Sequence, residues 1–350
     1  GIDIPDTLGM QEYFLRSTND NHLFIVGGSP VATLYGVYKF LESTGIGYSI
    51  DEDIIPDKQV KSVRLSGFNK IYKPAFNLRG ILPFHDFPEG PDWWNENDYK
   101  AVITQLPKLG MNFIGFHTYP INIGPHTSPV NDGSKAEPLV WIGLRGQFNS
   151  DGTVKTAYPV LHANTRDGSF GYYSRKTSDY SFGALQIFGT DYYGADYMEN
   201  ISKWPHTPQE NMEIFNKVGK LLHNAFALAK DLGVKTCVGT EIPLTLPASV
   251  KKTLRSRGID PASDRAVQEA YEGIFSRIKA TYPLNYYWLW TPESWTWQGE
   301  TNEEINNTEK DLKNAVVAAR KINAPFTLAT CGWVLGPSRN RAEFDTLLPK

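Results

Sequence analysis

The chain has 350 residues, enough for about two domains, and its 35 Lys and Arg residues against 38 Asp and Glu residues give a formal net charge of −3. So weak a charge attracts neither nucleic acid nor an anionic membrane, and we exclude both as partners. The hydrophobic fraction of 41% is typical of a folded chain. The sequence contains no apolar run of 18 residues and no basic stretch followed by an apolar one near its start, so we expect neither a membrane span nor a signal peptide in it.

Residues 22–50 predict a small α/β unit. A strand is expected over 22–26 and a helix after the turn Gly27-Gly28-Ser29-Pro30, followed by a second strand over 46–50. The glycine pair has neither the Walker spacing nor a G-x-G-x-x-G pattern, so it predicts a tight turn and not a phosphate loop. Residues 59–76 are expected to add one or two strands. We assign residues 1–72 to this small domain.

From residue 77 onward, strands and helices alternate, which indicates a parallel sheet covered by helices. The expected strands are 77–84, 111–117, 234–240, 285–291 and 325–331, and the expected helices are 95–109, 210–232, 264–280 and 309–321. Five such repeats predict a (β/α)8 TIM barrel over residues 73–350, with a long insertion at 119–205. Because an open barrel leaves an unpaired edge, we expect the chain to be a fragment that holds only part of this barrel. The alternative is a complete doubly wound sheet.

Two carboxylates, Glu241 and Glu293, follow consecutive predicted strands. Neighbouring strands lie about 4.8 Å apart, so both side chains can share one cleft. Cleavage of a glycosidic bond needs one protonated carboxyl group and one ionised group that acts as nucleophile or base. We predict Glu293 as the general acid, because its tryptophan neighbours, Trp290 and Trp295, favour a protonated carboxyl by excluding water. Glu241 is the second catalytic candidate, and its alternative role is to hold a sugar hydroxyl.

Aromatic residues make up 13% of the chain, and this excess is typical of a carbohydrate site, with a Trp-rich core as the alternative. The predicted substrate-binding residues lie after strands or in the insertion: His85, Asp86, His117, Tyr119, Trp141, Arg145, Trp290, Trp295 and Trp333. Arg145 suits the carboxylate or sulfate of an acidic sugar, with a surface ion pair as its alternative role. No metal is expected, because the sequence contains no H-x-H or H-E-x-x-H pattern and its two cysteines, Cys237 and Cys331, have no ligand-spaced partner.

Two stretches carry a resemblance to known enzymes. Residues 25–29 and 32–42, Ile-Val-Gly-Gly-Ser and Ala-Thr-Leu-Tyr-Gly-Val-Tyr-Lys-Phe-Leu-Glu, resemble the small α/β domain that precedes the barrel in glycoside hydrolase families 20, 67, 89 and 115. Residues 76–80, the pair Trp93-Trp94 and residues 109–112 are similar to the start of their barrels. The His-x-Gly-Gly-Asp-Glu pattern of family 20 is absent. The resemblance to family 67 implies that Glu293 corresponds to the acid and that the base carboxylates lie beyond Lys350.

These features together predict an exo-acting glycoside hydrolase. We expect it to act on a complex plant or algal polysaccharide, to be α-glucuronidase-like or related, to need no cofactor and to be periplasmic or secreted. Its expected partner is an oligosaccharide or polysaccharide substrate. The alternatives are a non-catalytic carbohydrate-binding protein on a decayed barrel and a metal-dependent hydrolase that uses His85 and His117.

Overall fold

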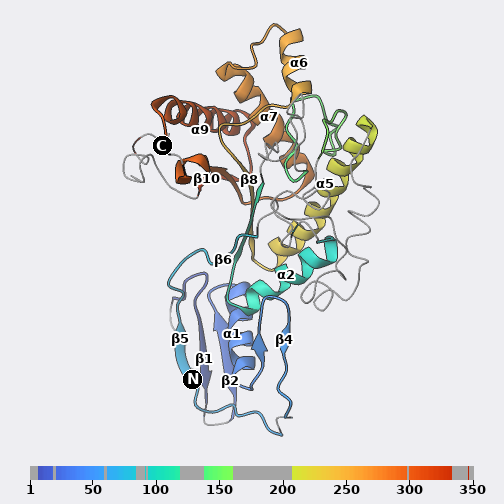
Figure 1. The fold of residues 1–350 in the computed structure, drawn as a ribbon. Coiled ribbons are helices and arrows are strands. Elements are labelled where there is room, and N and C mark those ends of the chain that lie inside the picture. The colour runs from blue at the N-terminus through green and yellow to red at the C-terminus, as the bar shows by residue number, and fades with distance from the viewer. Residues whose placement is uncertain are drawn as a thin grey trace. The chain divides into compact units, whose positions relative to one another are not determined.

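The computed structural model describes residues 7–18, 21–58, 61–83, 91, 94–118, 138–160, 207–297, 299–332 and 346 (Figure 1). Its strands are β1 Tyr13–Ser17, β2 Leu23–Gly27, β3 Gly47–Tyr48, β4 Asp53–Ile54, β5 Asn69–Tyr72, β6 Gly80–Ile81, β7 Phe113–Thr118, β8 Lys235–Glu241, β9 Tyr286–Trp290 and β10 Thr327–Cys331. Its helices are α1 Pro30–Glu42, α2 Glu96–Lys108, α5 Pro208–Asp231, α6 Ala248–Ser256, α7 Asp264–Thr281, α8 Ser294–Trp297 and α9 Asn302–Ile322. No helix within these ranges is long and apolar enough to cross a membrane.

The contacts within the chain divide it into two compact units. Unit 1 comprises Gly1–Ile81, Tyr99–Ile114 and Leu228–Lys235. Unit 2 comprises Leu82–Asp98, Gly115–Ala227 and Thr236–Lys350.

Unit 1 contains a three-stranded antiparallel sheet with β1 at its centre, between β2 and β5. Tyr13 of β1 lies opposite Gly27 on one side and opposite Tyr72 on the other. Helix α1 packs against β1 and β2, as can be followed in Figure 1. The predicted strand at 22–26 and the helix after it therefore correspond to β2 and α1, whereas β1 was not predicted.

The turn that leads into α1 explains its two glycines. Ser29 caps the helix, since its Oγ accepts a hydrogen bond from the Ala32 N–H at 3.2 Å, and Pro30 follows in the first turn. A Cβ atom on Gly28 would lie 2.1 Å from the Gly9 carbonyl oxygen, and one on Gly27 would lie 2.2 Å from the Thr33 nitrogen. The glycines therefore permit close backbone approach, as a tight turn requires.

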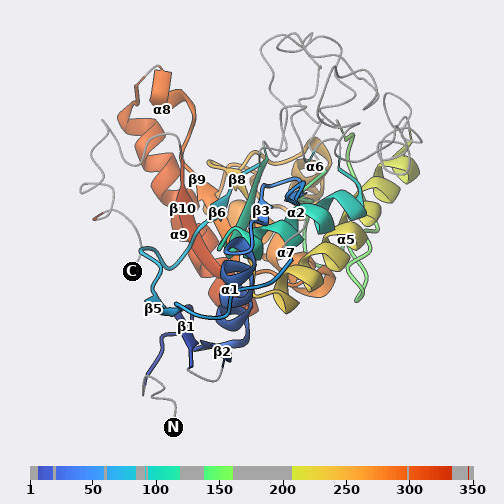
Figure 2. The same cartoon turned by 90° about the horizontal axis from the view of Figure 1, so that it is seen from below.

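The second large sheet is parallel, with the strand order β10-β9-β8-β7-β6. This spatial order follows the chain order without a reversal, and the neighbouring strands β8, β9 and β10 can be traced in Figure 2. A doubly wound sheet reverses its strand order at a switch point. The sheet is therefore singly wound, as barrels are, although the five described strands form an open sheet and not a closed barrel.

Helices cover one face of this sheet in unit 2. Phe116 of β7 stacks on Phe226 of α5, with ring centroids 6.1 Å apart. Tyr287 of β9 meets Phe275 of α7 edge to face, with centroids 5.0 Å apart. Both helices thus pack on the face that carries Phe116 and Tyr287, and the residues between these positions along the strands point to the opposite, inner face.

A single tryptophan spans three strands on the inner face. The Trp288 indole extends from β9 across β8 to β7, where its Nε1–H donates a hydrogen bond to the Phe116 carbonyl at 3.1 Å. Cβ atoms on Gly115 and Gly239 would lie 2.2 Å and 1.9 Å from the indole. The two glycines therefore make the space that the ring fills, in the large-and-small alternation typical of barrel interiors.

Candidate functional site

Three of the predicted residues lie side by side at the carboxyl edge of the parallel sheet. His117 stands near the end of β7, and Glu241 and Trp290 end β8 and β9, where they are register partners. Because Gly239 and Trp288 face inward two residues earlier, Glu241 and Trp290 face inward as well. The His117 ring contacts the Trp290 ring with centroids 4.4 Å apart. These three side chains form the carboxyl-edge row, directly above the layer that Trp288 fills.

Glu293 lies one short turn beyond this row. The chain leaves β9 at Trp290 and enters α8 at Ser294, and the turn is closed by hydrogen bonds from the Trp295 N–H to the Pro292 carbonyl and from the Thr296 N–H to the Glu293 carbonyl. The Glu293 side chain is half-buried, whereas Trp290 and Trp295 are each 3% exposed. The turn thus holds the predicted acid at the carboxyl end of β9, next to two buried indoles.

A buried aspartate fixes the segment that follows Glu241. Asp311 of α9 accepts hydrogen bonds from the Leu244 N–H at 2.8 Å and from the Tyr271 hydroxyl. Burial raises the pKa of Asp311 to about 6, although both hydrogen bonds act in the opposite direction. Asp311 is a positioning residue that was not among the residues predicted from the sequence. A signal was available, because Asp311 stands next to Leu312 on a helix face that buries Ala315 and Ala318.

A second buried carboxyl group, Asp98, was also missed. Asp98 stands in the first turn of α2 and is 0% exposed. Its Oδ2 accepts a hydrogen bond from the Asn95 N–H at 2.9 Å, while Oδ1 has no hydrogen-bond partner in the described part of the chain. Burial raises the pKa of Asp98 to about 7. A carboxyl group that titrates near neutral pH is a common feature of functional sites, so Asp98 joins the candidate residues.

Trp141 and Arg145 lie elsewhere in unit 2. Trp141 is 2% exposed, donates a hydrogen bond to the Thr156 carbonyl at 3.1 Å, and lies under the Arg277 guanidinium of α7 at 5.7 Å. Arg145 is largely exposed and pairs with Glu272 of α7 at 3.9 Å. Both residues therefore pack along α7 and not at the carboxyl edge: Trp141 belongs to the core, and Arg145 makes an ion pair.

Four further predicted residues, His85, Asp86, Tyr119 and Trp333, lie outside the described residues. So does Trp93, whereas its neighbour Trp94 is buried. Within the described ranges, no three His, Cys, Asp or Glu side chains are grouped closely enough to hold a metal ion.

Solved structures of one enzyme share this fold. The family 89 glycoside hydrolase from Clostridium perfringens in complex with 2-acetamido-1,2-dideoxynojirmycin matches with a TM-score of 0.55 at 14% identity, over 99% of this chain and 36% of that one. Its complex with PUGNAc matches with a TM-score of 0.53 at 13% identity, over 97% and 35%. A variant with two glutamates changed to glutamine, in complex with its substrate GlcNAc-alpha-1,4-galactose, matches with a TM-score of 0.53 at 13% identity, over 95% of this chain and 34% of that one.

This likeness establishes a glycoside hydrolase-like fold without fixing the family. The chain spans about a third of the length of the structures that it matches. No protein-family model matches the sequence, and neither does any curated protein.

Proposed function

We propose that this chain supplies a small α/β unit and the first strands of the barrel of an exo-acting glycoside hydrolase. The observation that carries the proposal is the carboxyl-edge row of His117, Glu241 and Trp290, with Glu293 one turn beyond it. In singly wound parallel sheets, the carboxyl ends of the strands are where substrates bind and react. The glycoside hydrolase-like fold supports the same assignment.

In the proposed mechanism, Glu293 is the general acid. Its carboxyl proton moves to the glycosidic oxygen as the bond from that oxygen to the anomeric carbon breaks. An ionised carboxylate stabilises the positive charge that develops on the sugar and then takes part as nucleophile or as the base that activates water. Glu241 is the candidate for this second role among the described residues. For His117, which is 0% exposed beside Trp290, we propose a hydrogen bond to a sugar hydroxyl as its role in the substrate complex.

The substrate that we propose is the non-reducing end of a complex plant or algal polysaccharide, met outside the cell or in the periplasm. Two sugar classes are the first to test. One is the α-linked N-acetylglucosamine that the family 89 structure holds in its substrate. The other is an α-linked glucuronic acid, which the sequence resemblance to family 67 suggests.

The decisive experiment compares Glu293→Gln with wild type in the protein that carries this chain, on two glycosides of the same sugar. One glycoside has a poor leaving group and needs protonation, and the other has a nitrophenolate leaving group and does not. We expect the variant to lose about 10²-fold or more in kcat on the poor leaving group and much less on the nitrophenyl glycoside. The matched control is Glu303→Gln, the same change at an exposed position on α9.

Equal losses on both glycosides would remove Glu293 from the acid role, because a general acid acts on the leaving group alone. Binding of glycans by calorimetry with no product over a broad panel would instead favour the carbohydrate-binding alternative.

A further inference from the structure

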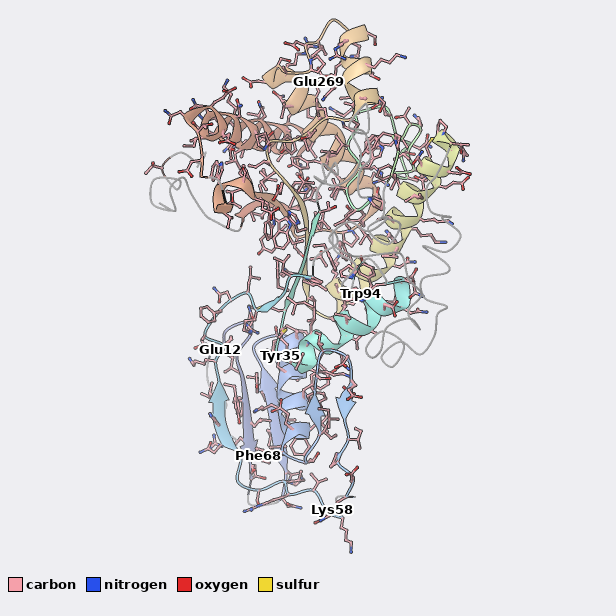
Figure 3. All side chains as sticks on the ribbon, viewed as in Figure 1. Glu12, Tyr35, Lys58, Phe68, Trp94 and Glu269 are labelled. Atoms are coloured by element: carbon pink, nitrogen blue, oxygen red, sulfur yellow. The ribbon has the colours of Figure 1, made fainter. Side chains whose placement is uncertain are left out.

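Unit 1 contains a cavity of about 460 Å³, within the range of small-molecule sites. It is lined by side chains of β1, α1 and β5, by residues 11, 73, 74 and 79, and by residues 107–110 at the end of α2. All of these residues belong to unit 1. Figure 3 shows Tyr35, which lines the cavity, at the end of unit 1 where Glu12 also lies, whereas Phe68 and Lys58 lie at the other end.

Two stacked tyrosines form one wall of the cavity. Tyr13 of β1 and Tyr72 of β5 are register partners, with ring centroids 4.9 Å apart and planes within 12° of each other. Gly36 of α1 lets the Tyr13 ring lie close to the helix, because an added Cβ would come 3.2 Å from that ring. Burial raises the pKa of Tyr13 to about 12, so its hydroxyl stays a neutral hydrogen-bond donor. Tyr13 covers one face of the Tyr72 ring, so the opposite face of Tyr72 is the one that can take the face of a pyranose ring.

The lining is strongly cationic in a chain whose net charge is −3. Five basic side chains and one acidic one line the cavity: Lys39, Lys70, Lys73, Arg79, Lys108 and Glu42. Three of the lysines have a carboxylate within 4 Å, since Lys39 pairs with Glu42, Lys73 with Glu12 and Lys108 with Asp53. Within the described residues, no carboxylate pairs with Lys70 or Arg79. A concave wall with uncompensated positive charge concentrates anions.

Arg79 is held rigidly by neutral groups. Its Nε–H donates to the Gly110 carbonyl at 2.8 Å, and Nη1 donates to the Phe76 carbonyl and to the Gln11 amide oxygen, both at 2.6 Å. None of these acceptors carries charge, so the positive charge of the guanidinium is oriented and uncompensated. Lys70 is exposed, and its ammonium lies 5.0 Å from the centroid of the Tyr72 ring. The Arg79 cation is thus fixed, whereas the exposed Lys70 side chain can leave the Tyr72 ring when a sugar takes its place and can pair with the acidic group of that sugar.

We propose that this cavity binds an acidic sugar unit of a polysaccharide, with the pyranose face against Tyr72 and its carboxylate or sulfate between Lys70 and Arg79. The choice of a sugar over other flat anions rests on the proposed function. The cavity would hold an anionic chain to unit 1, separately from the reaction at the carboxyl edge of the parallel sheet. Charged hydrogen bonds to Lys and Arg supply the affinity, and the stacked tyrosines supply the selectivity for a ring.

Calorimetry on the protein that carries this chain tests the proposal with four probes. These are an oligogalacturonate, a sulfated galactan oligosaccharide, a neutral galactan oligosaccharide of the same length, and inorganic sulfate. We expect one or both acidic oligosaccharides to bind, with an affinity that falls as salt is added. Which of the two binds more tightly tells a carboxylate site from a sulfate site. Equal binding of the neutral oligosaccharide or of inorganic sulfate would overturn the proposal, as would binding of neither acidic probe.

Substitutions then locate the binding. Lys70→Gln should lower the affinity for the acidic oligosaccharide about tenfold, because it removes a charge-assisted hydrogen bond. The matched control is Lys58→Gln, an exposed lysine at the opposite end of unit 1, which should leave the affinity within about twofold. Tyr72→Ala should lose binding and Tyr72→Phe should keep it. Equal effects of Lys70→Gln and Lys58→Gln would show that the glycan binds elsewhere. Calorimetry measures binding and not turnover, so the two proposals can fail separately. A protein that binds the acidic oligosaccharide but hydrolyses no glycoside would keep this binding site and remove the proposed activity. An active enzyme that does not bind the oligosaccharide would remove the binding site alone.

Discussion

Replacing Asp311 by asparagine is expected to remove a pH-dependent loss of stability from unit 2. Asp311 is 3% exposed, and both of its oxygens accept hydrogen bonds, from Leu244 and Tyr271. Asparagine has the same shape. Its carbonyl can accept from the Leu244 N–H while its amide donates to the Tyr271 oxygen, so the substitution removes the charge and keeps both hydrogen bonds.

The size of the effect follows from the pKa. Burial raises the pKa of Asp311 from 3.8 to about 6 in the folded protein. The folded state therefore holds the proton of Asp311 more tightly than the unfolded state, so the contribution of Asp311 to stability is greatest below about pH 4 and falls as the pH rises through 6. The difference of about 2 between the folded and unfolded pKa values corresponds to about 3 kcal/mol of unfolding free energy. This contribution is lost in full by about pH 7. The asparagine variant has no such loss.

Urea denaturation followed by tryptophan fluorescence, at several values between pH 4.5 and 8, measures this difference. The free energy of unfolding of Asp311→Asn relative to wild type should rise by about 2 kcal/mol over this range, since about 1 of the 3 kcal/mol is already lost at pH 4.5. The control is Asp264→Asn, the same change at an exposed position of α7. Its free energy of unfolding should change with pH in the same way as that of wild type. Parallel curves for Asp311→Asn and wild type would refute the reasoning, because they would mean that Asp311 titrates alike in the folded and unfolded states.

Two further substitutions test the packing and the helix boundaries. Gly239→Ala should destabilise the protein by about 1–3 kcal/mol or more and lower its thermal midpoint, because the added Cβ would lie 2.0 Å from the Trp288 carbonyl oxygen. The control is Gly9→Ala, whose Cβ would meet only the flexible Glu12 side chain and should leave the thermal midpoint nearly unchanged. Thr301→Ala should cost about 1 kcal/mol in chemical denaturation, since Thr301 and Glu304 form a capping box at the start of α9, and an unchanged midpoint would contradict that role.

The repeating elements of the parallel sheet were predictable because their signals are local. The helix expected over 210–232 is α5, Pro208–Asp231, and the strand expected over 234–240 is β8, Lys235–Glu241. An amphipathic helix and a buried strand each carry their period within a short stretch of chain. The residues that end such strands are placed by the strands, so Glu241 and Trp290 could be assigned to strand ends from the sequence, whereas the shared cleft of Glu241 and Glu293 stays a prediction.

Elements whose stability comes from distant partners were missed. β1 is only five residues long and owes its place to β2 and β5, the second of them about fifty residues away. The helix expected over 309–321 begins earlier, at Asn302, although the capping pattern from Thr301 to Glu304 was present to mark its start. The capping pattern was therefore visible in the sequence, but the start of the helix was predicted from the apolar period, which is weak in its first turns.

The insertion shows why site residues away from strands are harder to place. Trp141 and Arg145 have the side chains of a sugar site, yet they pack along α7. No local pattern says against which surface a long segment will fold, because that depends on contacts such as the one between Gly143 and Gly273, where a Cβ on Gly273 would lie 1.8 Å from the Gly143 carbonyl oxygen.

The Trp288 indole that spans three strands also determines when the inner face of the sheet can be filled during synthesis. Its hydrogen bond to Phe116 joins residues 172 positions apart, so β7 and β8 leave the ribosome with the space above Gly115 and Gly239 unfilled. At about 5–20 residues per second, β9 follows β7 by roughly 10–30 s and follows β8 by roughly 2–10 s. During this interval the apolar edge of the nascent sheet is open to water and to other chains, and contacts of such long range also form slowly. The position of one tryptophan therefore determines how long the inner face of the nascent sheet stays unfilled.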